Sequence, residues 1–189
     1  MVINSLNPRI QRAAAIIQGG GIVAYPTEAV WGLGCDPFNE QAVNGILALK
    51  RRQRGMGLIL IAATVNQLQP FLTHIKPEQR KQLLESWPGP NTWLVPNNGL
   101  APDWITGGRN TLAMRVTDHP LASALCKAVG GPIVSTSANP HGLQPARSAV
   151  KVRCYFGRAL DDVLPGSVGS SANPSTIRDL LSGHIIRPG

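Results

Sequence analysis

The sequence predicts an α/β protein with a largely parallel or mixed sheet and flanking helices. Short apolar runs that suit buried strands alternate with segments of helical periodicity. Hydrophobic residues make up 43% of the 189 residues and charged residues only 15%, which is typical of a compact protein with a core. Glycine (20) and proline (16) are spread along the chain and indicate many tight turns. We therefore expect one domain over residues 1–189.

The elements of the first half follow from capping residues and apolar spacing. Asn7 and Pro8 are typical of a helix start, and apolar residues recur at helical spacing until the glycines at 19–21. A short buried strand is expected at residues 22–25. Asn39 can cap a second helix with one apolar face. The run at 58–62 lacks alternation, which is typical of a central strand covered on both faces. The other elements expected are short helices at 64–72 and 77–84, strands at 93–95 and 111–116 joined by a loop, a helix at 120–129, a strand at 132–134, a helix at 146–156, and short strands around 163, 175–177 and 184–187.

Positive charge is concentrated just after the second helix, in the segment Lys50-Arg51-Arg52-Gln53-Arg54. The chain carries 18 Lys and Arg against 10 Asp and Glu, for a net charge of +8. A cluster held between two core elements can direct its charge at a polyanion such as a nucleotide or RNA. An unwound helix end would let Lys50, Arg52 and Arg54 converge on phosphate oxygens. The alternative is a solvated helix end whose cations complement the helix dipole.

Cysteine, histidine and apolar patterns point to a cytoplasmic protein without a metal site of its own. The three cysteines are far apart, and the four histidines form no ligand pair, so we expect reduced thiols and no metal. No leader and no apolar run long enough for a bilayer is recognisable, so no membrane partner is expected. Walker-type and GxGxxG phosphate motifs are also absent.

Two segments that follow predicted strands carry polar groups suited to a ligand. Residues 135–139 (STSAN) follow the strand at 132–134, and ligands of open α/β sheets lie beyond the carboxyl ends of strands. The alternative is a turn that satisfies its own backbone. The second segment, after the strand at 22–25, contains Thr27, Glu28 and Trp31. Glu28 is either a turn cap or a candidate base, and Trp31 is expected in the core.

Seven motifs, taken together and in order along almost the whole chain, resemble the YrdC/TsaC family, the threonylcarbamoyl-AMP synthases of tRNA modification. They are YPTEAVWGLG (25–34), KRR (50–52), WPGPNT (87–92), MRV (114–116), STSAN (135–139), PSTI (174–177) and IRPG (186–189). The resemblance implies a twisted, open α/β sheet around a large basic cavity. It also implies an adenylyltransferase that joins L-threonine, bicarbonate and ATP into threonylcarbamoyl-AMP and pyrophosphate, for t6A at position 37 of tRNA.

The resemblance assigns roles to ten residues. In the family's Lys-x-Arg motif the two cations hold the phosphates, so Lys50 and Arg52 are the expected catalytic residues. The nucleotide-side positions, besides these two, are Thr111, Ser137, Asn139 and Arg187. The positions that match the threonine pocket are Thr27, Arg115, Ser135 and Ser175. Magnesium is expected to arrive with ATP. Expected partners are tRNA or double-stranded RNA and the downstream proteins that transfer the threonylcarbamoyl group.

The chain departs from the family pattern after Lys50–Arg52, where Gln53 and Gly57 replace usual prolines and residues 58–62 lack a common histidine. The main alternative function is a non-catalytic RNA-binding protein of RNA or ribosome maturation, which the net charge also suits. A carbamoyl-adenylate enzyme, like the YrdC-like domains of hydrogenase maturation, is a third possibility. The lack of accessory zinc-finger or acylphosphatase segments argues against it.

Overall fold

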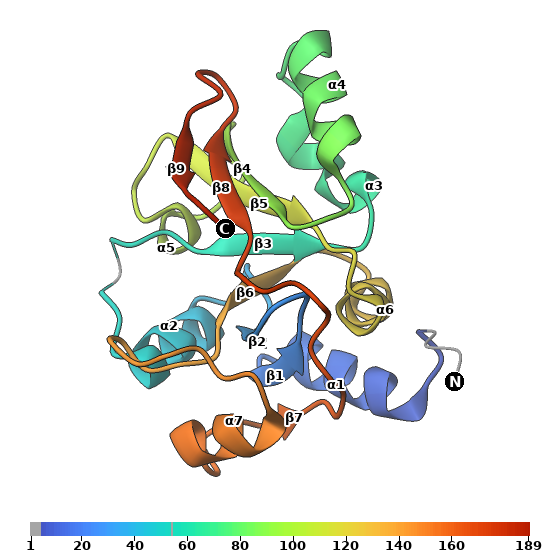
Figure 1. Cartoon of the computed structure of the whole chain (residues 1–189), viewed down its shortest axis with the longest axis vertical. Coiled ribbons are helices and arrows are strands. Elements are labelled where there is room, and N and C mark those ends of the chain that lie inside the picture. The colour runs from blue at the N-terminus through green and yellow to red at the C-terminus, as the bar shows by residue number, and fades with distance from the viewer. Residues whose placement is uncertain (1–4, 54) are drawn as a thin grey trace.

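The computed structural model describes residues 5–53 and 55–189 (Figure 1). Its described residues include one mixed sheet of nine strands in the order β7-β1-β2-β6-β3-β5-β4-β8-β9. The pairs β1–β7, β3–β5 and β4–β8 are parallel, and the other neighbouring pairs are antiparallel. The predicted α/β fold with a mixed sheet is confirmed.

The strands lie close to the predicted runs, with one addition. They are β1 (Val23–Pro26), β2 (Trp31–Gly34), β3 (Ile59–Ala62), β4 (Asn91–Pro96), β5 (Thr111–Val116), β6 (Ile133–Ser137), β7 (Asp162–Val163), β8 (Thr176–Asp179) and β9 (Ile185–Arg187). The helices are α1 (Pro8–Gln18), α2 (Glu40–Lys50), α3 (Val65–Leu68), the 3-10 helix η1 (Gln69–Leu72), α4 (Pro77–Ser86), α5 (Asp103–Thr106), α6 (Pro120–Val129) and α7 (Ala149–Phe156). None of these helices is long and apolar enough to cross a bilayer.

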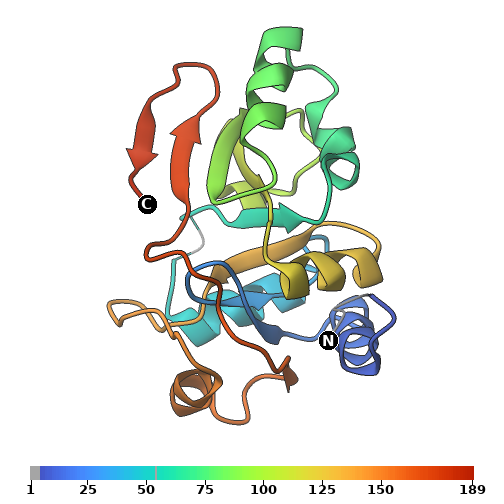
Figure 2. The ribbon, with the colours of Figure 1, turned by 45° about the vertical axis from the view of Figure 1, so that its right-hand side comes forward.

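The central strand β3 separates two apolar cores. Helices α1 and α6 lie side by side against one face of the sheet (Figure 2). Ile61 packs into the core beneath these two helices, whereas its neighbour Leu60 packs into the larger core that includes α2. Both side chains are almost fully buried. Because successive strand residues point to opposite faces, residues 58–62 need no polar alternation, as the sequence predicted.

Four segments differ from the predicted elements. Residues 31–34, for which no strand was predicted, form β2. The strand predicted at 132–134 extends to Ser137 as β6, where Thr136 pairs with Leu33 and Ser135 with Ile59, so residues 135–137 do not form the turn that was the alternative for this segment. The predicted helix at 64–72 divides into α3 and η1, because Pro70 has no N–H to continue α-helical hydrogen bonding. The loop before β5 contains the short helix α5.

Candidate active site

A cavity of about 360 Å³ lies at the middle of the sheet. Its walls come from the β1–β2 turn, the segment after α2, strands β3, β5 and β6, and the segment that leads into β8 and β9. All the predicted site residues line this cavity except Lys50 and Asn139. The structure thus brings together side chains from sequence positions as distant as Thr27 and Arg187.

The end of helix α2 directs the Lys-x-Arg motif toward this cavity. The helix ends at Lys50, and Arg51 has φ 51°, in the left-handed region. The amide of Arg52 bonds to the carbonyl of Leu47 at 2.9 Å, so the chain reverses in a Schellman motif. This reversal leaves Arg51 exposed, while Lys50 is 4% exposed and Arg52 reaches the cavity. The fourth cation of the cluster, Arg54, is outside the described residues.

The left-handed backbone conformation of Arg51 should affect the stability of the folded protein. Arg51→Val is expected to lower the free energy of unfolding by about 1–2 kcal/mol, since a β-branched residue is strained in the left-handed region. Arg51→Gly is expected to be neutral or slightly stabilising, because glycine adopts this region freely. Urea denaturation of both variants would test this. Equal losses in the two would show that the side chain of Arg51, and not its backbone, matters.

The Lys50 ammonium joins α2 to the end of β6. It donates to the carbonyl of Ser137, to the carbonyl of Asn139 at 2.9 Å and to Oδ1 of Asn139 at 3.4 Å. The amide of His141 in turn donates to the carbonyl of Lys50 at 2.7 Å. Burial and the neighbouring charge of Arg52 lower the pKa of Lys50 to about 8. Lys50 and Asn139 therefore lie directly behind the cavity wall formed by Ser137.

Arginine side chains give the cavity its charge. Arg52 donates from Nη1 to Oγ1 of Thr136 at 3.4 Å and from Nη2 to the carbonyls of Met56 and Gly57. Its pKa is lowered by burial and by the charges of Arg109 and Arg187. Arg187 donates to the carbonyl of Ser175 at 2.9 Å. Four arginines and one carboxylate are among the described residues that line the cavity: Arg52, Arg109, Arg115, Arg187 and Glu28. An anionic ligand would relieve this excess of positive charge.

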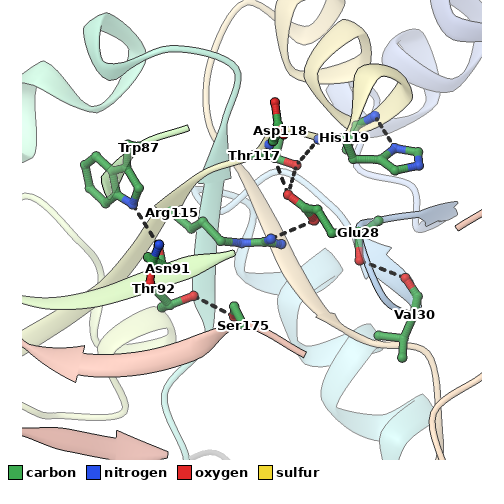
Figure 3. A network of polar contacts seen from close by, with 12 residues as sticks. Glu28, Val30, Trp87, Asn91, Thr92, Arg115, Thr117, Asp118, His119 and Ser175 are labelled. Carbon is green, nitrogen blue, oxygen red and sulfur yellow. Dashed lines mark hydrogen bonds and ion pairs between the residues drawn. The ribbon is translucent and has the colours of Figure 1, made fainter. Parts of the chain in front are cut away.

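The carboxylate at the cavity, Glu28, is held in a buried ion pair (Figure 3). Its Oε2 lies 2.6 Å from Nη1 of Arg115, and its Oε1 accepts from Oγ1 of Thr117 at 2.7 Å and from the amide of Asp118 at 3.0 Å. Burial alone would raise the pKa of Glu28, but Arg115 and Thr117 outweigh it and hold that pKa below its ordinary value. Glu28 is thus ionised at neutral pH and is a weak base.

Arg109 was not named from the sequence, and Thr136 and Glu28 were placed in segments suited to a ligand without a binding role for either; all three line the cavity. Arg109 follows two glycines with positive φ, Gly107 and Gly108, immediately before β5. The sequence does offer a signal for Arg109, because a cation that follows two glycines just before a strand is held by a tight turn. Only a loop is predicted there, with no role for its cation. Glu28 was considered as a base, and only the fold shows that its partner is Arg115.

Among the described residues, no group of three His, Cys, Asp or Glu gathers in a way that could hold a metal ion. Guanidinium and hydroxyl groups line the cavity, which lies across the middle of a mixed α/β sheet, and such groups are suited to an anion. These features define a class of proteins that bind phosphate-bearing ligands through cations and hydroxyls rather than through a glycine-rich loop.

Comparison with known proteins narrows this class to one family. The model of the Sua5_yciO_yrdC family, described as telomere recombination, matches residues 15–189. The chain belongs to this Sua5/YciO/YrdC family. It is 58% identical over 188 residues to a threonylcarbamoyl-AMP synthase of Cellvibrio japonicus, with both chains covered completely.

Two solved structures share the fold. Sua5 of P. abyssi, in complex with L-threonine, is 34% identical with a TM-score of 0.90, and the match covers 95% of this chain and 54% of that one. The chain thus spans about half of that longer protein. E. coli YciO is 24% identical with a TM-score of 0.82, over 94% of this chain and 87% of its own, and supports the fold alone.

Proposed function

We propose that this chain is a threonylcarbamoyl-AMP synthase, which forms threonylcarbamoyl-AMP and pyrophosphate from L-threonine, bicarbonate and ATP. Curated relatives that are 51–58% identical over at least 95% of the chain carry this name. The observation that carries the proposal is the cavity itself, whose described lining residues include four arginines and one carboxylate, and Arg115 already pairs with that carboxylate. The product would serve t6A formation at position 37 of tRNA.

The chemistry requires that anions be brought together. Bicarbonate first gives carbon dioxide and hydroxide. The neutral amine of threonine then attacks the carbon of carbon dioxide, and the proton that the amine loses combines with the hydroxide to form water, which leaves a carbamate. A carbamate oxygen then attacks the α-phosphorus of ATP, and the bond to the bridging oxygen breaks to release pyrophosphate. Because ATP, the carbamate and the threonine carboxylate are all negative, their approach costs Coulomb energy that fixed cations can offset. Positioning and charge neutralisation then supply catalysis without a covalent nucleophile.

The residues at the two sides of the cavity suggest where each substrate binds. Arg52 and Arg187, with the hydroxyls of Thr111 and Ser137, are proposed to hold the nucleotide. Lys50 and Asn139 are proposed to support this side through the end of β6, because the Lys50 ammonium holds the carbonyls of Ser137 and Asn139 directly behind the cavity wall. Thr27, Arg115, Ser135 and Ser175 are proposed to hold threonine.

Magnesium is proposed to enter as part of the ATP substrate. The cavity offers one carboxylate, Glu28, and Arg115 already neutralises it. The ion would thus be coordinated by phosphate oxygens and water, as is usual for Mg²⁺ with nucleotides.

We further propose tRNA and the downstream threonylcarbamoyl-transferring proteins as partners, a cytoplasmic location and one domain over residues 1–189. The net charge of +8 suits a nucleic-acid partner, whose binding would weaken steeply with salt.

The decisive experiment is pyrophosphate release by the purified protein with ATP, bicarbonate and L-threonine. Release is expected to require threonine and to stop when threonine is omitted. No threonine-dependent release, together with salt-sensitive RNA binding that ATP does not compete with, would instead support the non-catalytic RNA-binding function.

A further inference from the structure

Glu28 lies in a position that the proposed reaction does not explain. It lines a cavity meant for three anions, yet it is itself an anion with 8% of its surface exposed. An unpaired carboxylate there would repel every substrate. Its pairing with Arg115 removes that repulsion, but it also uses one of the cations of the site. The benefit of Glu28 must therefore lie in the geometry that it imposes.

The side chain of Glu28 contacts β5 and the two residues that follow this strand after Val116. Arg115 lies on β5, and the chain just beyond that strand supplies Thr117 and Asp118, both of which donate to Oε1 of Glu28. The other oxygen, Oε2, takes Nη1 of Arg115 at 2.6 Å. The carboxylate thus connects the β1–β2 turn to β5 and to the residues just after it, through three donors at once (Figure 3).

The backbone of the same turn is fixed as well. The amide of Gly169 donates to the carbonyl of Thr27 at 3.0 Å, and the amide of Ser171 donates to the carbonyl of Glu28 at 3.1 Å. A Cβ on Gly169 would lie only 2.8 Å from the carbonyl oxygen of Glu28, so the segment approaches as closely as glycine allows. Neither the backbone nor the side chain of Glu28 is free to move.

Arg115 is held in turn by this rigid carboxylate. The Arg115 residue is 7% exposed, and its Nε finds no hydrogen-bond partner among the described residues. A guanidinium carries five N–H donors in one plane, so fixing Nη1 on Glu28 fixes the directions of the others. A planar, directed guanidinium suits a planar carboxylate, which accepts two parallel hydrogen bonds.

We propose that Glu28 is a positioning residue, which orients Arg115 so that its remaining donors receive the carboxylate of the amino-acid substrate. This inference rests on the proposed function, because it takes threonine as that substrate. Glu28 does not act as the general base for the amine, since its two oxygens are occupied by Arg115, Thr117 and Asp118. Its lowered pKa agrees with this assignment.

Steady-state kinetics of Glu28→Gln tests the proposal. The KM for threonine is expected to rise about tenfold or more, as for the loss of a charge-assisted hydrogen bond, while the KM for ATP stays within about twofold. Glu28→Asp should recover part of the threonine affinity, since it restores the charge at a shorter reach. The matched control is Glu40→Gln, the same change at an exposed residue outside the cavity, which should leave both constants unchanged.

Kinetics of Thr117→Val and pyrophosphate release by the wild type distinguish a failure of the positioning role from a failure of the proposed function. If Glu28→Gln does not fold, Thr117→Val removes one donor to Glu28 and keeps the ion pair, and a rise of about threefold in the KM for threonine alone is expected. Equal rises in both KM values, or no rise, would overturn the positioning role. Wild-type protein without threonine-dependent pyrophosphate release would overturn the proposed function itself.

Discussion

Arg52→Ala is expected to lower kcat by about 10²–10³-fold, which corresponds to about 2.7–4 kcal/mol of transition-state stabilisation. The side chain reaches the cavity and lies near two more guanidinium groups, those of Arg109 and Arg187. Negative charge that develops on the departing pyrophosphate would lose one of its fixed partners. Lys50→Ala is expected to have an effect of similar size. Pyrophosphate release at saturating threonine and ATP measures both.

The two variants differ in what else they disturb. Lys50→Ala removes both the ammonium, which donates to the carbonyls of Ser137 and Asn139, and the buried apolar stem. Lys50→Met keeps most of that stem, so it should accompany Lys50→Ala to separate the loss of charge from the loss of packing. Arg153→Ala, which removes an exposed cation on α7, controls for net charge and should retain full activity. Near-normal turnover in both Arg52→Ala and Lys50→Met would remove the Lys-x-Arg pair from the catalytic machinery.

Arg115→Met is expected to lower the free energy of unfolding by about 3–5 kcal/mol at neutral pH. The substitution leaves Glu28 as a buried charge whose partner is gone, and removing one member of a buried pair costs far more than removing both. The double variant Glu28→Gln/Arg115→Met should therefore recover much of the loss. Chemical denaturation of the wild type, the two single variants and the double variant completes the cycle.

The loss of unfolding free energy in Arg115→Met should also depend on pH. In the wild type the pKa of Glu28 in the folded state lies below its unfolded value, so the pair stabilises fully above about pH 4.3 and less as the pH falls through the folded pKa. In Arg115→Met the cation no longer lowers the pKa of Glu28, so that pKa should lie higher than in the wild type. The difference between variant and wild type should thus shrink on acidification. A loss that is independent of pH, or that the double variant does not recover, would mean that packing of the Arg115 stem dominates.

Most of the sheet was predictable, because its strands are apolar runs bounded by glycine and proline. Strand β2 was not, since two of its four residues, Gly32 and Gly34, are glycines, which are uncommon in strands. The structure shows why glycine is required at Gly34. A Cβ there would lie 2.7 Å from the ring of Tyr25 and 2.8 Å from the carbonyl of Val134. Glycine is needed at this position because β1 and β6, the two neighbours of β2, both come close to it. No local sequence pattern reveals that closeness.

The site was predictable as a set of residues but not as a geometry. The Lys-x-Arg and Ser-x-Asn motifs carry a family resemblance, and the structure places them against each other through Lys50 and Asn139. The sequence does not show that the Lys50 ammonium is shared among backbone oxygens, or that Glu28 and Arg115 pair across 87 positions of chain. Such contacts depend on how the strands are ordered in space: β6, β3 and β5 are neighbours in the sheet, although they do not follow one another in this order along the chain.

Strand β9 closes one side of the cavity and is also the last strand of the sheet. Within residues 5–53 and 55–189 it pairs with β8 alone, through a register that is irregular at Ile177 and Arg178, and all three of its residues are exposed. Amide protons there should exchange with solvent sooner than those of β3, which has a neighbour on each side. If added nucleotide slows amide exchange along β9, the nucleotide occupies the side of the cavity that Arg187 lines. This experiment needs no measurement of turnover.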